Sequence, residues 1–238
     1  YAVDMRLYAT EDETATYLLY PFIMATGGKM LSDDGKTAKG YLNSDQSVKG
    51  FQFLKDLESA GYTSYGIDKD GFFTGKHAMY LSSGWTIPDI KNKYSQTFPT
   101  EDSWGILPYP KDVAAVSPTA SWSFGMANID RGDKESVVKL LEWMVTPASS
   151  AAITTATGMI PARTSVVTDN PYAAGSAEKV LYDQLVTTGK KRPDTAAYST
   201  FSSAFANVII GLKNNNNVQS VVKSQTDALQ ADLDLFFS

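Results

Sequence analysis

Residues 73–85 read Phe-Thr-Gly-Lys-His-Ala-Met-Tyr-Leu-Ser-Ser-Gly-Trp, and this stretch decides our interpretation of the fold. It predicts a turn at Gly75, a short buried strand at 78–81 and a second sharp turn at Gly84. Glycine lets the backbone turn where other residues are strained, and the indole of Trp85 then offers a flat, rigid apolar face. A strand that ends in this way is suited to line a ligand-binding cleft.

The rest of the chain predicts a few strands followed by many helices, which is typical of an α/β layer with helices packed around it. Asn43 is expected to cap one helix, with Gln46 as its capping-box partner. Gly158 is expected to end another helix. Strands are predicted at 1–7, 78–81, 104–110 and 122–128, and helices at 14–26, 44–60, 88–93, 134–145, 147–158, 173–187, 198–212 and 218–236.

The composition excludes several classes of protein. The net charge of −5 argues against a nucleic-acid-binding protein, which is usually basic. The chain contains no cysteine, so disulfides, cysteine nucleophiles and thiolate metal sites are excluded. No apolar run approaches the roughly 20 residues that cross a bilayer. Tyr1 is not an initiator methionine, so a processed or truncated piece of a longer protein is expected.

The residues give little support for catalysis. His77 is the single histidine and has no nucleophile motif beside it, so a Ser-His-Asp site and common zinc sites are not expected. The Asp68 loop lacks the spacing of a calcium loop, and no glycine-rich phosphate loop is present. No metal site and no cofactor are therefore predicted. A glycoside hydrolase with two carboxylates remains an alternative, because such acids can come from anywhere in a fold.

Five segments occur in the order found in one family. The chain resembles the extracellular solute-binding proteins of sugar importers, the maltose-binding-protein-like family. The double glycine after an aromatic helix, the Gly-Lys-x-Ala-Met and Gly-Trp pattern, the Trp-Gly-Ile-Leu-Pro strand, a Val- and Leu-rich helix, and Gly-Met-Ile-Pro-Ala carry the resemblance. These segments lie at 17–28, 73–85, 104–110, 134–145 and 158–162.

The resemblance implies an α/β, type II periplasmic-binding-protein-like fold of two lobes. Residues 1–106 and 159–238 are expected to form the C-terminal lobe, and residues 107–158 a returning segment of the N-terminal lobe. Most of the N-terminal lobe is then missing from this sequence. We expect it in cis or as a separate segment, because the returning helices would otherwise expose apolar stripes.

The resemblance also implies a set of ligand-binding residues. Trp85, after Gly84, is expected to stack on a sugar ring, although an ordinary core tryptophan is an equal alternative. Tyr17 and Tyr198 occupy positions matching further ligand-facing aromatics. Other expected contacts are Trp122 and Ser121 at the cleft floor and an acid before the Tyr17 helix, with Glu13 chosen among Glu11, Asp12 and Glu13.

The function implied is an extracellular receptor and not an enzyme. It would capture a carbohydrate, an oligosaccharide by expectation, and deliver it to the membrane permease of an ATP-binding-cassette importer. A lipoprotein anchor or a periplasmic location is expected. The alternatives are a glycoside hydrolase and a surface adhesion module that has lost its ligand.

Overall fold

The computed structural model describes residues 1–10, 13–128 and 133–238. Helix dominates, as expected, and the strands are short. In chain order the elements are β1 (Val3–Asp4), α1 (Thr14–Ala25), α2 (Asp45–Ser59), β2 (Met79–Tyr80), α3 (Thr86–Pro88), a π-helical turn (Asp89–Lys93), a 3-10 turn (Glu101–Ser103), β3 (Ser117–Pro118), α4 (Lys134–Met144), α5 (Pro147–Thr157), α6 (Thr164–Asp169), α7 (Ala177–Thr188), β4 (Gly189–Lys190), α8 (Tyr198–Asn214) and α9 (Val218–Phe236).

The chain divides into two compact units, and each unit is formed by segments that are separated in the sequence. Unit 1 comprises Tyr1–Leu81, Pro108–Thr119 and Gln184–Ser238, and unit 2 comprises Ser82–Leu107 and Ala120–Asp183. The division into lobes expected from the family, with boundaries at 106/107 and 158/159, stays a prediction.

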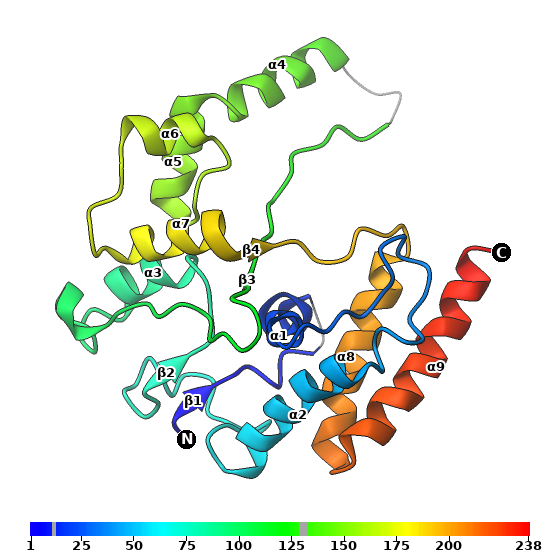
Figure 1. Ribbon diagram of the computed structural model, residues 1–238. Coiled ribbons are helices and arrows are strands. Elements are labelled where there is room, and N and C mark those ends of the chain that lie inside the picture. Colours follow the sequence, from blue (N-terminus) through cyan, green and yellow to red (C-terminus); the bar gives the residue numbers. More distant parts are fainter. Residues whose placement is uncertain (11–12, 129–132) are drawn as a thin grey trace. The chain divides into compact units, whose positions relative to one another are not determined.

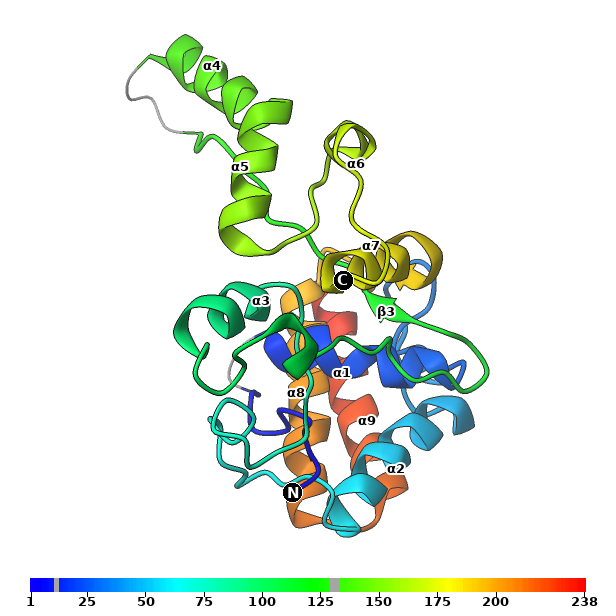
Figure 2. The same ribbon diagram turned by 90° about the vertical axis from the view of Figure 1, so that its left-hand side faces the viewer.

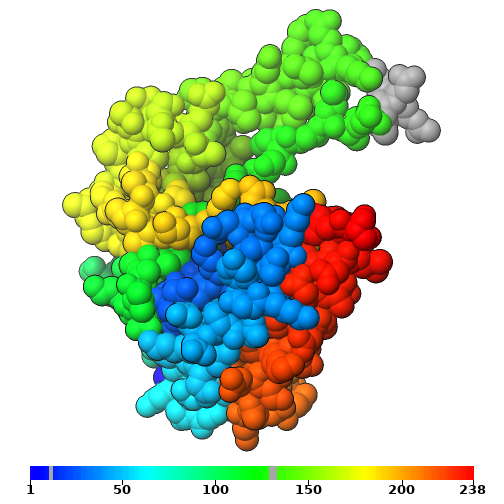
Figure 3. Space-filling view, turned by 45° about the vertical axis from the view of Figure 1, so that its right-hand side comes forward, coloured from blue at the N-terminus to red at the C-terminus, as the bar shows by residue number. Residues whose placement is uncertain are grey.

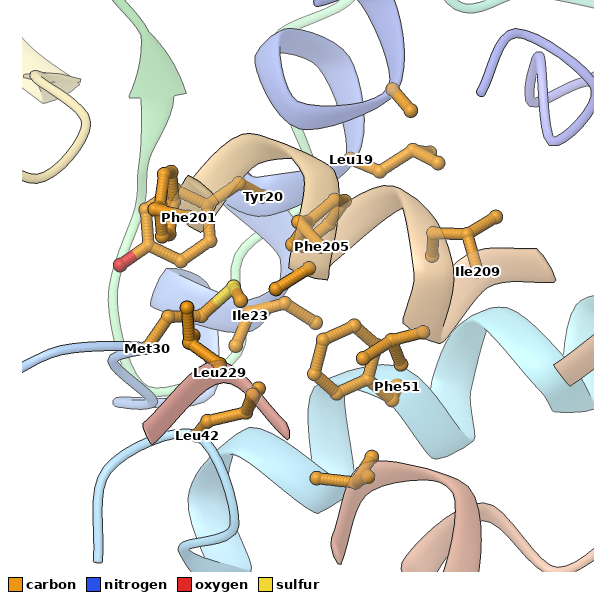
Figure 4. Close-up of a cluster of buried hydrophobic side chains, with 14 of the residues drawn as sticks. Leu19, Tyr20, Ile23, Met30, Leu42, Phe51, Phe201, Phe205, Ile209 and Leu229 are labelled. Carbon is orange, nitrogen blue, oxygen red and sulfur yellow. The ribbon is translucent and has the colours of Figure 1, made fainter. Parts of the chain in front are cut away.

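Four helices form the core of unit 1. Helix α1 packs against α2 and α8, and α9 packs against α8 and α2 (Figures 1 and 2). Aromatic side chains fill the space between these helices: the Phe205 ring centre lies 5.9 Å from that of Tyr20 and 5.6 Å from that of Phe51 (Figure 4). Phe51, Phe201 and Phe205 are completely buried. Burial of such large apolar side chains is the dominant stabilising contribution in this unit.

A polar side chain fixes the segment between α1 and α2 against α9. The Gln230 side-chain oxygen accepts hydrogen bonds from the backbone N–H of Ala38 at 2.8 Å and of Lys39 at 3.2 Å. In Figure 3, α9 (orange to red) lies at the surface beside this blue segment. A loop of about 20 residues is thus held without secondary structure of its own.

The strands are shorter and less buried than expected. β1 pairs in parallel with β2, with Asp4 opposite Tyr80, and β3 pairs in parallel with β4. The strand predicted at 1–7 is reduced to two residues, and the prediction of a buried strand at 78–81 is wrong because Met79 is 46% exposed. A two-stranded sheet buries little surface and supports only short strands. Alternation of apolar and polar residues in the sequence therefore predicts longer strands than form.

Most helix ends follow the sequence signals. Helix α1 ends before Gly27, which has a φ of 83°, and α5 begins at Pro147 and ends at Gly158, whose φ is 68°. The predicted capping box at Asn43 is wrong by one residue. Ser44 caps α2 instead, accepting a hydrogen bond from the Ser47 N–H at 3.2 Å, while Asn43 accepts from Gly40 in the preceding turn.

Unit 2 departs most from the sequence expectations. The strands predicted at 104–110 and 122–128 are extended segments without a ladder in the described part of the chain. The sequence also predicts a turn at 130–134, before the helix at 134–145, and this turn lies largely outside the described residues. Helix α6 was not predicted, whereas α4 forms as expected but has no buried residue. Within the described ranges, none of the helices has the length and apolar character needed to span a membrane.

Candidate functional site

The described side chains of unit 1 converge around Glu13, directly before α1. Both Arg192 and the Tyr198 hydroxyl donate hydrogen bonds to the Glu13 Oε1, and the Ser202 hydroxyl donates to Oε2 at 2.5 Å. Ser202 also shares a hydrogen bond with the Thr16 hydroxyl at 2.8 Å. We call Glu13, Tyr17, Arg192, Tyr198 and Ser202 the tyrosine–arginine cluster.

Arg192 lies against both tyrosine rings of this cluster. Its guanidinium carbon is 5.4 Å from the centre of the Tyr17 ring and 5.5 Å from that of Tyr198. A guanidinium at this distance is attracted by the electron-rich face of an aromatic ring. One cation therefore holds two aromatic rings in a fixed relation to a carboxylate.

Local structure explains why these side chains meet. Glu13 and Tyr17 are one helical turn apart, and the Tyr17 N–H donates to the Glu13 carbonyl at 2.9 Å. Tyr198 and Ser202 are likewise four residues apart in the first turns of α8, so their side chains share one face. Packing of α1 against α8 brings the two pairs together.

The tyrosine–arginine cluster holds one negative charge, one positive charge and several hydroxyl donors, so it is neutral overall. The Arg192 side chain is 19% exposed and that of Glu13 is 42% exposed, so water reaches the carboxylate. Burial, followed by the hydrogen bond to Glu13, raises the pKa of Tyr198 well above its ordinary value. The phenol thus stays protonated and continues to donate.

A hollow of about 280 Å³ lies beside the cluster and is lined by Thr119, Lys191, Arg192, Pro193, Asp194 and Tyr198. A second hollow, of about 310 Å³, lies between α8 and α9. Short polar and aliphatic side chains line the second hollow, and its described lining contains no aromatic ring. Only the first hollow therefore combines an aromatic face with charged groups, as sugar sites require.

Comparison with known proteins identifies the family. The family described as bacterial extracellular solute-binding protein matches residues 6–179. The chain belongs to this family of solute-binding proteins. No match to a curated protein is found.

Solved structures share the fold of this solute-binding protein. They include an ABC transporter solute-binding protein from Thermotoga lettingae bound with α-D-tagatose (TM-score 0.81, 19% identity). The GacH receptor of Streptomyces glaucescens, solved unliganded and with acarbose, gives 0.79 and 18%, and the Thermus thermophilus maltotriose-binding protein gives 0.71 and 20%. In each comparison 98% of this chain is covered, but only 59%, 58% and 61%, respectively, of the relative. The chain thus spans about three fifths of the length of the structures it matches.

These likenesses confirm the type II, periplasmic-binding-protein-like α/β fold expected from the sequence. Three of the predicted site residues of this solute-binding protein, Glu13, Tyr17 and Tyr198, lie together in unit 1. The other four, Gly84, Trp85, Ser121 and Trp122, belong to unit 2.

Gly84 and Trp85 lie where the chain of unit 2 begins its first helix. Trp85 is partly buried and precedes α3 directly. A Cβ added at Gly84 would lie 2.3 Å from the Gly158 carbonyl oxygen, so only glycine allows these two backbone segments to approach so closely. The close approach fixes the position of the tryptophan backbone within the unit.

Ser121 and Trp122 lie in an extended segment instead of the predicted strand. Trp122 is 84% exposed, so it is not a core residue of the described chain, and the Ser121 hydroxyl donates to the Trp122 carbonyl at 3.0 Å. Without a neighbouring strand, neither side chain is fixed by a ladder. The strand prediction is wrong here because strand formation depends on pairing partners that a local pattern does not reveal.

Sequence reasoning missed Arg192 and Ser202 as members of the site. The available signals were a cation close to an α8 helix that begins with Tyr198, and Ser202 one turn further along the same helix face. A metal site was not predicted, and within the described ranges no three His, Asp or Glu side chains converge as metal ligands would.

Proposed function

We propose that this chain forms the ligand-holding part of an extracellular receptor for carbohydrates. The observation that carries the proposal is the tyrosine–arginine cluster, which presents two aromatic rings, a carboxylate and a guanidinium beside a hollow in unit 1. Aromatic rings accept the apolar face of a sugar, and charged groups form strong hydrogen bonds with its hydroxyls. The named ligands of the similar structures, α-D-tagatose, acarbose and maltotriose, support a sugar as the ligand class.

Each predicted residue has a role in this proposal. Tyr17 and Tyr198 stack on sugar rings, Glu13 accepts hydroxyl hydrogen bonds, and Trp85, set by Gly84, supplies a further stacking face. Ser121 and Trp122 add contacts when their segment is ordered by neighbouring protein. The exposed Glu13 carboxylate retains lone pairs for a ligand, since its side chain is 42% exposed.

The proposed mechanism is ligand-induced closure followed by delivery. Sugar that binds between two lobes favours the closed form, and the closed form docks on the permease of an ATP-binding-cassette importer. An oligosaccharide fits a site with several aromatic faces. An extracellular or periplasmic location, with a lipid anchor in the former case, belongs to the same proposal.

Catalysis fits this site poorly. A glycoside hydrolase needs two carboxylates on opposite sides of the bond that breaks. Both oxygens of Glu13 accept hydrogen bonds from protein donors, and Asp194, the described acid that lines the hollow, pairs with Lys191 at 2.9 Å. Both acids are therefore already held by partners within the protein.

Unit 2 exposes apolar side chains that a partner would cover. Trp122 is 84% exposed, Trp143 63% and Leu140 53%, and α4 (green in Figure 3) lies at the surface. Monomeric proteins rarely leave so many large apolar groups in water. We propose that polypeptide supplying the remainder of the N-terminal lobe, in cis or as a separate segment, covers this surface and that residues 107–158 belong to that lobe.

A thermal-shift screen of the complete reading frame against mono- and oligosaccharides tests the receptor function. A ligand at one hundred times its dissociation constant adds about 2.7 kcal/mol of stability, which raises the melting temperature visibly. Tyr17→Ala should remove most of this rise, whereas Tyr62→Ala, whose side chain is 54% exposed and outside the cluster, should not. A cooperative melt that no sugar moves contradicts the proposal, as does recovery of a cleaved sugar.

A further inference from the structure

The carboxyl ends of β1 and β2 carry a group of charged and aromatic residues outside the tyrosine–arginine cluster. The two strands are parallel and pair Asp4 with Tyr80. Arg6 follows β1 by two residues. Ligands of open α/β sheets bind beyond the carboxyl ends of parallel strands, because loops diverge there and leave room.

The backbone of Arg6 is strained. Its φ is 54°, the only positive value at a non-glycine residue in the described chain. Residues other than glycine rarely adopt a positive φ. Those that do cluster at binding sites, where the surrounding structure holds them in place.

Among the described residues, the Arg6 guanidinium has no hydrogen-bond acceptor. Its carbon lies 5.6 Å from the centre of the Tyr80 ring, and its Nε is buried without a hydrogen-bond partner. Among the hydrogen bonds and ion pairs of the described residues, none involves the Arg6 side chain, although that side chain is only partly buried. Arg192, by contrast, pairs with Glu13.

The neighbouring acid, Asp4, already has hydrogen-bond partners. Asp4 is 1% exposed, and its two oxygens accept hydrogen bonds from the Arg6 backbone N–H at 2.7 Å and the Tyr8 hydroxyl at 3.1 Å. Burial raises the pKa of Asp4, and the charges of Arg6 and His77 only partly oppose this rise. A second cation is close, since the Lys69 Nζ lies 4.7 Å from the centre of the Tyr8 ring.

We propose that Arg6 binds the carboxylate of a small acidic solute, a uronate, at the carboxyl ends of β1 and β2. A guanidinium is a planar fork whose terminal N–H groups match the two oxygens of a carboxylate, and the Tyr80 face fixes the plane of that fork. Lys69 adds a second positive charge at the rim. This inference rests on the proposed receptor function and extends it to acidic sugars.

The test is a nitrogen NMR titration that follows the Arg6 Nε–H signal, assigned by its loss in Arg6→Lys. The complete protein is titrated with sodium glucuronate, with glucose, and with sodium chloride at matched ionic strength. A saturable shift of the Arg6 signal with glucuronate alone supports the proposal. No saturable shift, an equal shift with glucose, or an equal shift with chloride overturns it.

Two variants separate the binding role from a structural role. Arg6→Lys keeps the charge but loses the fork, so glucuronate affinity should fall roughly tenfold, which corresponds to 1.4 kcal/mol. Arg6→Gly suits the positive φ, so its melting temperature should stay the same or rise while glucuronate binding is lost. Unchanged glucuronate affinity in Arg6→Gly overturns the proposal, and the wild-type titration decides the matter if either variant misfolds.

These experiments distinguish failure of the Arg6 site from failure of the proposed receptor function. If a neutral sugar raises the melting temperature but glucuronate leaves Arg6 unmoved, only the Arg6 site is lost. If no sugar stabilises the protein through Tyr17 and Tyr198 but the Arg6 signal saturates with glucuronate, the Arg6 site stands and the neutral-sugar receptor does not.

Discussion

Replacing Arg192 by methionine tests whether one cation organises the candidate site. The substitution removes a charge-assisted hydrogen bond to Glu13, worth about 1.5–3 kcal/mol, and two ring contacts worth about 0.5–1 kcal/mol each. The Glu13 side chain is 42% exposed and keeps Tyr198 and Ser202 as donors, so water offsets part of the loss. We expect unit 1 to lose about 2 kcal/mol.

The assay is urea unfolding followed by far-UV circular dichroism. All four tryptophans of the sequence lie in unit 2, so tryptophan fluorescence would report on the wrong unit. Lys191→Met is the matched control, because Lys191 pairs with Asp194 on an exposed surface and its loss should change stability by less than about 0.5 kcal/mol.

A double-mutant cycle with Glu13→Gln isolates the coupling between the two charged groups. We expect a coupling energy of about 1 kcal/mol or more, since the partners touch. If Arg192→Met is no more destabilising than Lys191→Met, or if the coupling energy is zero, the cluster is not held by Arg192 and our reasoning about the site is refuted.

Three further predictions concern stability. Gly84→Ala places a Cβ 2.3 Å from the Gly158 carbonyl oxygen and should destabilise unit 2 by about 1–3 kcal/mol. Urea unfolding followed by tryptophan fluorescence measures this loss, and an unchanged midpoint would contradict the close approach. Phe205→Ala empties a fully buried position and should cost about 3–5 kcal/mol, measured by circular dichroism, with a loss below 1 kcal/mol arguing against this core. Burial raises the pKa of Asp4 above 3.8, so the folded state holds that proton more tightly than the unfolded state, and the Asp4 contribution to stability falls as pH rises through the raised pKa. The stability of Asp4→Asn relative to wild type should therefore increase from pH 4 upward, and a constant difference would show that Asp4 does not titrate abnormally.

The helices could be predicted where long apolar stripes and strong end signals agree. The bounds of α9 match the predicted range, and Gly158 ends α5 as expected. The sequence prediction placed the cap of α2 at Asn43, one residue before Ser44, because local propensity does not distinguish Asn from Ser at this position. The contacts of the folded chain decide it, since Asn43 is engaged by Gly40.

The strands were harder to predict because their partners lie far away in sequence. Residues 122–128 have strand composition, yet they are extended without a ladder. Hydrophobic alternation predicts a pleated surface but not what covers it. The exposure of Trp122 follows from the same cause.

Tyr17, Tyr198 and Glu13 of the candidate site were predicted from the sequence, whereas Arg192 and Ser202 were not. Tyr17 and Tyr198 were predicted because they match ligand-facing aromatics of the resembled family, and in the structure both rings lie against Arg192. Arg192 has no such match, because its role depends on Glu13, which lies 179 residues away. Distant pairings of this kind require the packing of α1 against α8, which no local pattern shows.

That separation has a consequence for the synthesis of the protein on the ribosome. Glu13 emerges before its partners Arg192, Tyr198 and Ser202, which follow 179 to 189 residues later. A nascent chain thus carries an unpaired acid until α8 has left the exit tunnel, and closing so long a loop is a slow step. Translation that stops before Arg192 would yield a polypeptide with most of its helices and no tyrosine–arginine cluster.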